Sequence, residues 1–169
     1  MNETLKQRTA SAKPIDSVEQ AFERALRYLG YRARSSAEVR TDLLRRGAAN
    51  TVIDATLEKL RGLKYIDDEA FARDWALARA QVHGYGPGKI GHELRTKGVA
   101  DRQIDAVVRE IFAAESEEAR ARKVLQKRFK SENVREPRTL RRAIAYLQRR
   151  GYSSKVIFAL LGSSLDDNS

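Results

Sequence analysis

The segment LLRRGA, Leu43–Ala48, recurs twice along the chain, as LRTKGV at Leu94–Val99 and as LQRRGY at Leu147–Tyr152. Its fifth residue is a glycine each time, and the three glycines are 51 and 53 residues apart. A glycine just after the last turn of a helix commonly takes left-handed backbone angles, which other residues adopt at a cost. Three similar helix ends at a near-constant distance indicate an internal repeat.

The residues around each glycine also repeat, and their spacing predicts two helices per unit. Apolar residues lie four positions before and six positions after the glycine: Leu43, Leu94 and Leu147, then Ile53, Ile104 and Ile157. Residue types that cap helix N-termini lie twelve positions before and three after it: Ser35, Gly86 and Thr139, then Asn50, Asp101 and Ser154. Each unit therefore reads as a helix, a glycine turn and a second helix.

A further helix precedes each pair. Its predicted N-caps are Ser17, Asp67 and Ser116, and Gln20 is expected to complete a capping box with Ser17. No segment is a credible strand, so we predict an all-α fold, an elongated tandem array of three three-helix units that resemble helix-turn-helix repeats. Neighbouring units should stack, because each is too small to bury its own apolar faces. The predicted parts are a flexible tail at 1–16, repeats at 17–67, 68–115 and 116–162, and a flexible tail at 163–169.

Composition excludes several classes of function. The chain has 169 residues, a net charge of +10 and no cysteine, so disulfides and thiolate sites are excluded. Its two histidines cannot form a zinc site alone. Without a membrane-spanning apolar run or a secretory signal, we expect a cytoplasmic protein. The acidic cluster Asp67–Glu69 is interpreted as helix capping, and no catalytic, cofactor-binding or metal-binding residue is predicted, so we expect no enzyme.

The stretch Gly86–Gly91 reads G-P-G-K-I-G and matches the G-x-G-x-x-G pattern of dinucleotide-binding turns. That turn must follow a strand, whereas the preceding segment has a helical pattern, and Lys89 is not followed by the Ser or Thr of a P-loop. We expect Gly86 to be a helix N-cap with Pro87 at the first helical position. Tyr85 lies between two glycines and either packs on its own unit or contacts a partner.

Three stretches of the chain resemble the RecX family, the bacterial regulators of the recombinase RecA. They are KYIDDEAFARDWA at Lys64–Ala76, GYGPGKIGHELRTKGV at Gly84–Val99, and the paired-helix pattern that ends in LLRRGA and LQRRGY. The resemblance implies a non-catalytic, three-unit helical protein that lies along the groove of the RecA–single-stranded DNA filament. Such proteins typically restrain filament growth, ATP hydrolysis and strand exchange. RecA and this filament are therefore the expected partners, and we expect a monomer.

The positive charge is concentrated in the last unit. Residues 116–162 contain 13 Lys and Arg against 4 Asp and Glu, which gives +9, whereas residues 68–115 carry −1 and residues 17–67 carry +3. A charged helix face is often merely solvated, but so few acids favour contact with a polyanion. We expect unit 3, helped by Arg45 and Arg46, to contact DNA or an acidic groove, while units 1 and 2 dock on protein. The candidate filament- or nucleic-acid-binding residues are Arg45, Arg46, Tyr85, Lys89, Arg95, Lys97, Arg138, Arg141, Arg142, Arg149 and Arg150.

Two other classes of function stay open at this point. Paired helices with a glycine turn also resemble the helix-turn-helix units that read double-stranded DNA. Base reading needs exposed Arg, Asn or Gln residues at a helix start, and only Arg102 and Gln103 qualify here. A duplex-binding protein is the alternative. A helical scaffold is the third class, and it predicts no dependence on nucleic acid.

Overall fold

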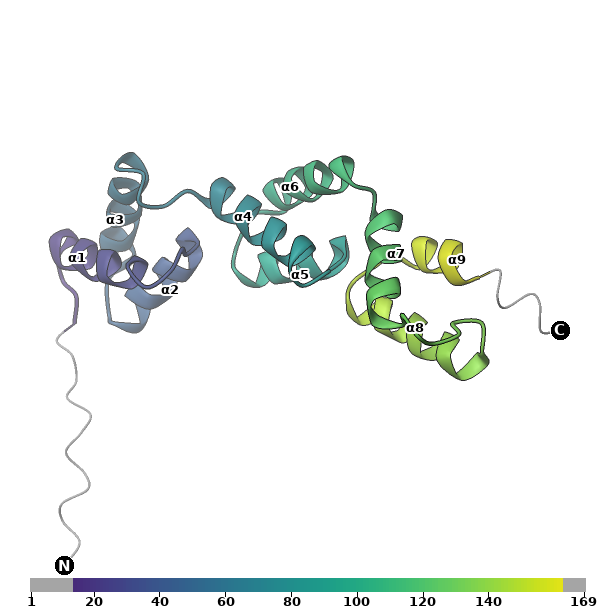
Figure 1. Cartoon of the computed structure of the whole chain (residues 1–169). Coiled ribbons are helices and arrows are strands. Elements are labelled where there is room, and N and C mark those ends of the chain that lie inside the picture. The colour runs from purple at the N-terminus through teal and green to yellow at the C-terminus, as the bar shows by residue number, and fades with distance from the viewer. Residues whose placement is uncertain (1–13, 163–169) are drawn as a thin grey trace, which may run out of the picture. The chain divides into compact units, whose positions relative to one another are not determined.

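The computed structural model describes residues 14–162, which form nine α-helices and no strand (Figure 1). The helices are α1 (Val18–Leu29), α2 (Ser36–Arg45), α3 (Asn50–Gly62), α4 (Asp68–Gln81), α5 (Pro87–Thr96), α6 (Asp101–Ala114), α7 (Glu117–Arg128), α8 (Pro137–Arg149) and α9 (Ser154–Leu161). Three consecutive sets of three helices each surround their own apolar core, which confirms the all-helical fold and the three-helix repeats. The described residues divide into two compact units, one ending at Asp68 and one beginning at Glu69.

The two tails expected at 1–16 and 163–169 fall mostly outside the described residues. Ile15 is the exception, because its side chain is buried in the core of the first unit. Its backbone N–H also donates to the carbonyl of Arg46 at 3.2 Å. The expected flexible tail is therefore wrong for Ile15, since burial of an apolar side chain and a backbone hydrogen bond both hold the chain at this point.

The first unit consists of α1, α2 and α3 around one core. Its buried apolar residues are Ile15, Ala21, Ala25, Val39, Leu43, Ala48, Ile53, Leu57, Leu60 and Ile66. The start of α2 is fixed by a capping box, in which the Ser35 hydroxyl accepts from the Glu38 N–H and the Glu38 carboxylate accepts from the Ser35 N–H. The next N–H, that of Ser36, donates to the Asp68 carboxylate at 2.7 Å. Asp68 of the acidic cluster therefore accepts from an N–H group at a helix start, and that helix is α2.

The three glycine turns are confirmed, and each ends its helix in the same way. The φ angles of Gly47, Gly98 and Gly151 are +79°, +74° and +79°. In each turn the residue after the glycine donates its N–H to the carbonyl five positions earlier, which is the hydrogen bond of a Schellman motif. Lys64, with φ of +58°, ends α3 with the same motif. The sequence analysis missed this turn because it carries no glycine.

Four of the nine predicted N-caps are displaced. Ser17, Ser35, Gly86 and Ser116 are confirmed as N-caps, whereas Asn50, Asp101, Ser154 and Thr139 are wrong. The first three of these are the first helical residues, because Ala49, Ala100 and Ser153 hold the extended backbone of the cap. Pro137 starts α8 two residues before Thr139, since its fixed φ suits the first helical position. Gln20 accepts from the N–H of Asp16 and not from that of Ser17.

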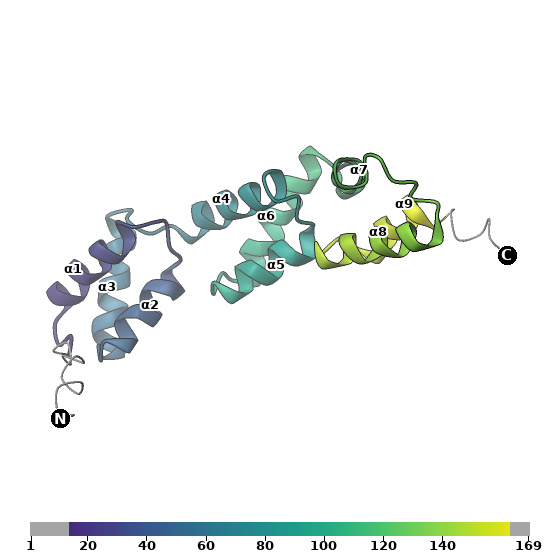
Figure 2. The same cartoon turned by 60° about the horizontal axis from the view of Figure 1, so that its bottom comes forward.

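The second unit contains α4–α9 and two apolar cores. The core of repeat 2 consists of Phe71, Ala72, Ala76, Ala80, Ile90, Leu94, Val99, Ile104, Val107 and Ile111. That of repeat 3 consists of Ala121, Leu125, Phe129, Leu140, Ala143, Leu147, Tyr152, Ile157 and Leu161. Figure 2 shows the C-terminal end of α8 beside the start of α5, where the two repeats meet.

Main-chain atoms form this junction, and the glycine-rich segment makes it possible. The N–H of Gly86 donates to the Arg150 carbonyl at 2.7 Å, and the N–H of Gly88 donates to the Gly151 carbonyl at 3.0 Å. A Cβ atom on Gly86 would lie 2.7 Å from that Gly151 oxygen, and one on Gly151 would lie 2.8 Å from the Cα of Lys89. Gly86 and Gly88 of the G-x-G-x-x-G pattern, together with Gly151, thus allow two backbones to touch. Gly86 is the N-cap of α5 and Pro87 its first residue, as predicted.

Side chains reinforce the junction from the repeat 3 side. The Arg150 guanidinium donates to the carbonyl of His83, and the Tyr152 hydroxyl donates to the carbonyl of Gly84 at 3.2 Å. Burial raises the pKa of Tyr152 to about 12, because the ionised ring oxygen would lose its contact with water. Tyr85 packs against the core of repeat 2 and also has the Arg150 guanidinium 5.8 Å from its ring centre.

Candidate nucleic-acid interface

An arginine-lined groove crosses repeat 3 between the end of α7 and the exposed face of α8. Its volume is about 490 Å³. Its lining residues are Arg128, Phe129, Arg138, Arg141, Arg142, Ala145, Tyr146 and Arg149. We call it the arginine groove. Among the described residues that line it there is no acidic side chain.

The sequence of α8 places these cations on one side of the helix. Leu140, Ala143 and Leu147 are buried in the core of repeat 3. Arg138, Arg141, Arg142 and Arg149 follow them at helical spacing on the opposite, exposed side. The helix therefore has an apolar side in the core and an arginine-rich side in solvent.

Two aromatic rings lie at the bottom of the arginine groove. Phe129 and Tyr146 meet edge to face with ring centres 5.7 Å apart. The guanidinium groups of Arg128 and Arg142 lie 5.3 Å and 5.7 Å from the centre of the Phe129 ring. Phe129 is buried in the core of repeat 3, whereas Tyr146 is half-buried. An accessible ring beside cations suits a single nucleic-acid strand, because bases stack on aromatic faces while the cations meet phosphates. Arg128, Phe129 and Tyr146 were not among the candidate residues expected from the sequence.

The five arginines differ in how far their charge is compensated. Glu132 pairs with Arg142 at 2.5 Å and lies 3.8 Å from Arg128. The other three arginines of the groove, Arg138, Arg141 and Arg149, are exposed and form no ion pair with a residue of the described range. Three cations on one face without an internal counter-ion form the strongest anion-attracting feature of the second unit.

The predicted cations of repeat 1 lie in the first compact unit and have different surroundings. Arg45 is exposed and pairs with no described residue. The Arg46 Nε lies 3.5 Å from the Asp42 carboxylate, which also accepts two hydrogen bonds from Arg24 at 2.7 Å and 2.8 Å. The hydrogen bonds from Arg24 hold the pKa of Asp42 below its usual range. Arg46 is thus part of an ion network of its own repeat.

The predicted residues of repeat 2 are mostly engaged inside the repeat. Arg95 pairs with Asp101 at 2.7 Å, and the Lys97 ammonium lies 4.1 Å from the centre of the Trp75 ring. The Lys89 ammonium lies 4.7 Å from the centre of the Tyr85 ring, at the junction that Arg150 also serves. These contacts place Tyr85, Lys89 and Arg150 together at the junction, and Arg150 also lies 4.5 Å from the centre of the Tyr146 ring, which lines the arginine groove.

The helix-turn-helix alternative gains little from the start of α6. Arg102 and Gln103 line a small groove of about 380 Å³, where Glu69, Arg73 and Glu110 also lie. Two carboxylates in the same groove repel the phosphates that flank any base edge.

The described residues contain no group of three His, Asp or Glu side chains that could hold a metal ion. None of their helices is long and apolar enough to cross a membrane.

Comparison with known proteins points to one family. Models of the first, second and third three-helix domains of RecX match residues 21–60, 67–108 and 115–161. Two proteins named Regulatory protein RecX, from Geobacillus kaustophilus and Mycolicibacterium vanbaalenii, are 36% and 32% identical to this chain. The alignments cover 86% and 87% of this chain, and 54% and 83% of the two relatives. The chain thus spans about half the length of the Geobacillus relative.

Two solved structures are also similar. A crystal structure of regulatory protein RecX has 26% sequence identity and a TM-score of 0.69, over 86% of this chain and 73% of the other. A crystal structure of RecX from Lactobacillus salivarius has 18% identity and a TM-score of 0.69, over 89% of this chain and 95% of the other. At that lower identity the second structure supports the fold alone. The two curated relatives and the first of these structures carry the name regulatory protein RecX.

Proposed function

Since this chain belongs to the RecX family of regulatory proteins, we propose that it modulates the recombinase RecA. In this proposal it binds the groove of the RecA–single-stranded DNA filament and restrains filament growth, ATP hydrolysis and strand exchange. It acts as a monomer in the cytoplasm and has no catalytic activity of its own.

One observation carries the proposal beyond the family name, and it is the arginine groove. Three uncompensated arginines and an aromatic floor fit a phosphate backbone with bases beside it. Cations that neutralise phosphates release counter-ions, so binding through the groove should weaken steeply as salt rises. Direct contact of repeat 3 with DNA is therefore the first element of the proposed pose.

The remaining sequence-predicted residues supply the second element. Repeat 2 is nearly neutral, which suits a protein surface better than a phosphate backbone. We place repeats 1 and 2 against RecA subunits, with Arg45 as an exposed cation available to the filament. Arg46, Arg95 and Lys97 support their own repeats in this proposal, because each already has a partner there. Arg150 supports the junction, because it donates to the His83 carbonyl of repeat 2.

The decisive experiment is a titration of RecA ATP hydrolysis on single-stranded DNA with this protein. The wild type should lower the hydrolysis rate in a saturable way. The triple variant Arg138→Glu, Arg141→Glu, Arg149→Glu should need a much higher concentration. The slope of log affinity against log salt should flatten by about 2, since each single-strand phosphate contact contributes roughly 0.7.

A matched control separates a specific groove from net charge. Lys127, Arg135 and Lys155 are exposed on the same repeat, outside the arginine groove. Their triple replacement by glutamate changes the net charge equally and should retain most of the affinity and the salt slope. If the two triple variants behaved alike, the groove would have no specific role. If wild-type protein left hydrolysis and filament assembly unchanged, the proposed function would be wrong.

A further inference from the structure

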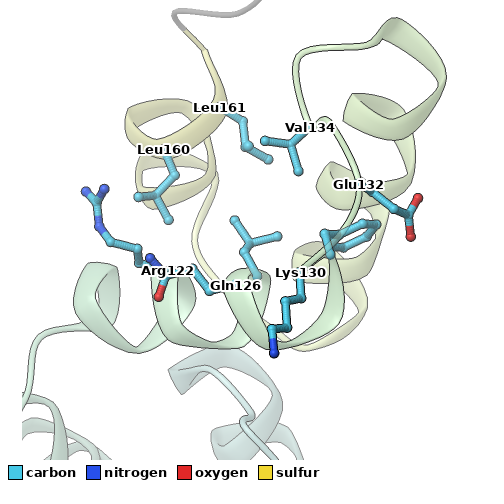
Figure 3. Close-up of a pocket in the computed structure, with 9 residues that line it drawn as sticks. Arg122, Gln126, Lys130, Glu132, Val134, Leu160 and Leu161 are labelled. Atoms are coloured by element: carbon cyan, nitrogen blue, oxygen red, sulfur yellow. The ribbon is translucent and has the colours of Figure 1, made fainter.

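A second pocket lies on repeat 3, enclosed by α7, the α7–α8 connection and α9 (Figure 3). Its volume is about 440 Å³, within the range of roughly 300–1,000 Å³ typical of ligand pockets. Its apolar lining consists of Leu125, Phe129, Val134, Leu160 and Leu161. Figure 3 shows Val134 and Leu161 pointing toward one another across the pocket, with Leu160 beside them. We call it the apolar pocket.

Cations lie at the edge of the apolar pocket. Lys130 is exposed at one side, and Arg122 is exposed at another, where it also pairs with Glu118 on its own helix. The single acidic lining residue, Glu132, is turned toward Arg142 and bonded to it. An apolar interior with a cationic edge favours a ligand that is apolar at its tip and negatively charged beside it.

The apolar pocket and the arginine groove share a wall. Phe129 lines both, and Glu132 at the edge of the apolar pocket bonds to Arg142 of the arginine groove, so the connection between α7 and α8 separates two sites of different chemistry. Phosphates suit the arginine groove, because Arg138, Arg141 and Arg149 are exposed there and form no ion pair with a described residue. The apolar pocket offers aliphatic walls, which suit inserted leucine-like or phenylalanine-like side chains better than a nucleic-acid backbone.

We infer that the apolar pocket binds an acidic segment of a partner protein, which inserts one or two apolar side chains between α7 and α9. This inference rests on the proposed function for the source of that segment, which is the protein component of the filament. It also changes the division of roles expected from the sequence, because repeat 3 would then contact protein and nucleic acid side by side.

A small amphipathic anion tests the pocket without any partner protein. Anilinonaphthalene sulfonate combines fused aromatic rings with one negative charge, and its binding is followed by fluorescence and by amide shifts of the 15N-labelled full chain. We expect saturable binding with shifts centred on Gln126, Val134, Leu160 and Leu161. Shifts confined to the arginine groove would overturn the inference, because the anion would then be held by charge alone.

Two variants and a control test the biological role of the pocket. Leu160→Glu and Val134→Glu place a negative charge at half-buried lining positions. Each should weaken binding of the probe and of the RecA filament by about tenfold or more, because it removes the burial of one apolar side chain at the interface. Phe158→Glu changes an exposed residue of the same helix outside the pocket and should change neither. Circular dichroism checks that each variant is folded.

Binding to naked labelled oligothymidylate separates this inference from the proposed function. The two pocket variants should bind it like the wild type, because the arginine groove is intact. If both pocket variants bound the filament like the wild type, the inference would fail and the proposed function would stand. If the wild type bound the probe in the pocket and ignored the filament, the proposed function would fail while the ligand class of the pocket was supported.

The same set of samples tests two other occupants of the apolar pocket. Leu165→Ser should leave probe affinity unchanged, and tighter probe binding would mean that the chain's own C-terminal segment occupies the pocket. Sedimentation should give one monomeric species for wild type and for Leu160→Glu. A wild-type dimer that Leu160→Glu dissociates would mean that a second copy fills the pocket, which would overturn the inference.

Discussion

Replacement of Gly151 by alanine should open the junction between repeats 2 and 3. The added Cβ would clash with the backbone nitrogen of Lys89, and backbone atoms cannot move aside as the tip of a side chain can. Two controls separate the contributions to this effect. Gly47→Ala has the same φ of +79° in the same kind of turn, but its Cβ would lie 3.4 Å from the nearest atom, on Pro14. Gly86→Ala has a φ of −84°, so it introduces the clash without left-handed strain.

The expected losses follow from these geometries. Left-handed angles cost alanine about 1–2 kcal/mol, partly offset by the lower entropy of its unfolded chain, so Gly47→Ala should cost about 1 kcal/mol. Gly151→Ala adds the loss of two main-chain hydrogen bonds across the junction, each about 0.5–1.5 kcal/mol, for a total of about 2–4 kcal/mol. Gly86→Ala lacks the strain and should cost about 1–3 kcal/mol.

Amide hydrogen exchange measured residue by residue is the assay, because it resolves the two compact units separately. The N–H groups of Gly86 and Gly88 bridge the junction and should lose protection in Gly151→Ala. They should keep it in Gly47→Ala, where the protection of Ala48 falls instead. Equal stability losses in Gly151→Ala and Gly47→Ala, with Gly86 and Gly88 still protected, would refute the reasoning. The strain of the turn would then account for the whole effect.

Three further outcomes are expected. Lys64→Gly should raise the free energy of unfolding of the first unit by about 0.5–1 kcal/mol in chemical denaturation, because glycine takes φ of +58° without strain; a loss would show that the lysine side chain matters more than the turn. Glu132→Gln removes the acid that pairs with two arginines of the arginine groove, so the affinity for an oligonucleotide should rise about two- to fivefold. Fluorescence anisotropy measures this affinity, and a fall would contradict an anion site in the groove. The pKa of Tyr152 is about 12 in the folded chain, above the ordinary 10, so the stability contributed by its neutral hydroxyl is complete below pH 10 and is lost as pH rises through 12. Tyr152→Phe should remove this alkaline loss of stability, measured by chemical denaturation at a series of pH values. An unchanged loss would assign it to other groups.

Local features of the fold could be predicted from the sequence because their causes are local. A glycine at the end of an apolar pattern indicates a left-handed helix end, and Gly47, Gly98 and Gly151 have these angles. The N-caps at Asn50 and Asp101 were misplaced by one residue, because Ala49 and Ala100 hold the extended cap conformation without any side-chain signal. The turn at Lys64 carried no glycine and was missed for the same reason.

Features that depend on distant parts of the chain could not be read in the same way. The residues of the junction are about 65 positions apart, and nothing near Gly86 indicates that Gly151 must lie against it. The concentration of positive charge in repeat 3 could be read from its composition. The aromatic floor could not, since Phe129 ends α7 and Tyr146 lies on α8, and only packing brings them together. Which of the sequence-predicted cations touch a filament stays a prediction.

The junction of main-chain atoms has a mechanical consequence. A contact through long side chains can lengthen by rotation about several single bonds, whereas hydrogen-bonded peptide groups are planar and cannot adjust in this way. A pull on the end of α8 would therefore reach the loop before α5 with little loss. Repeats 2 and 3 should therefore move as one rigid body under load, so that a displacement of one repeat is transmitted to the other.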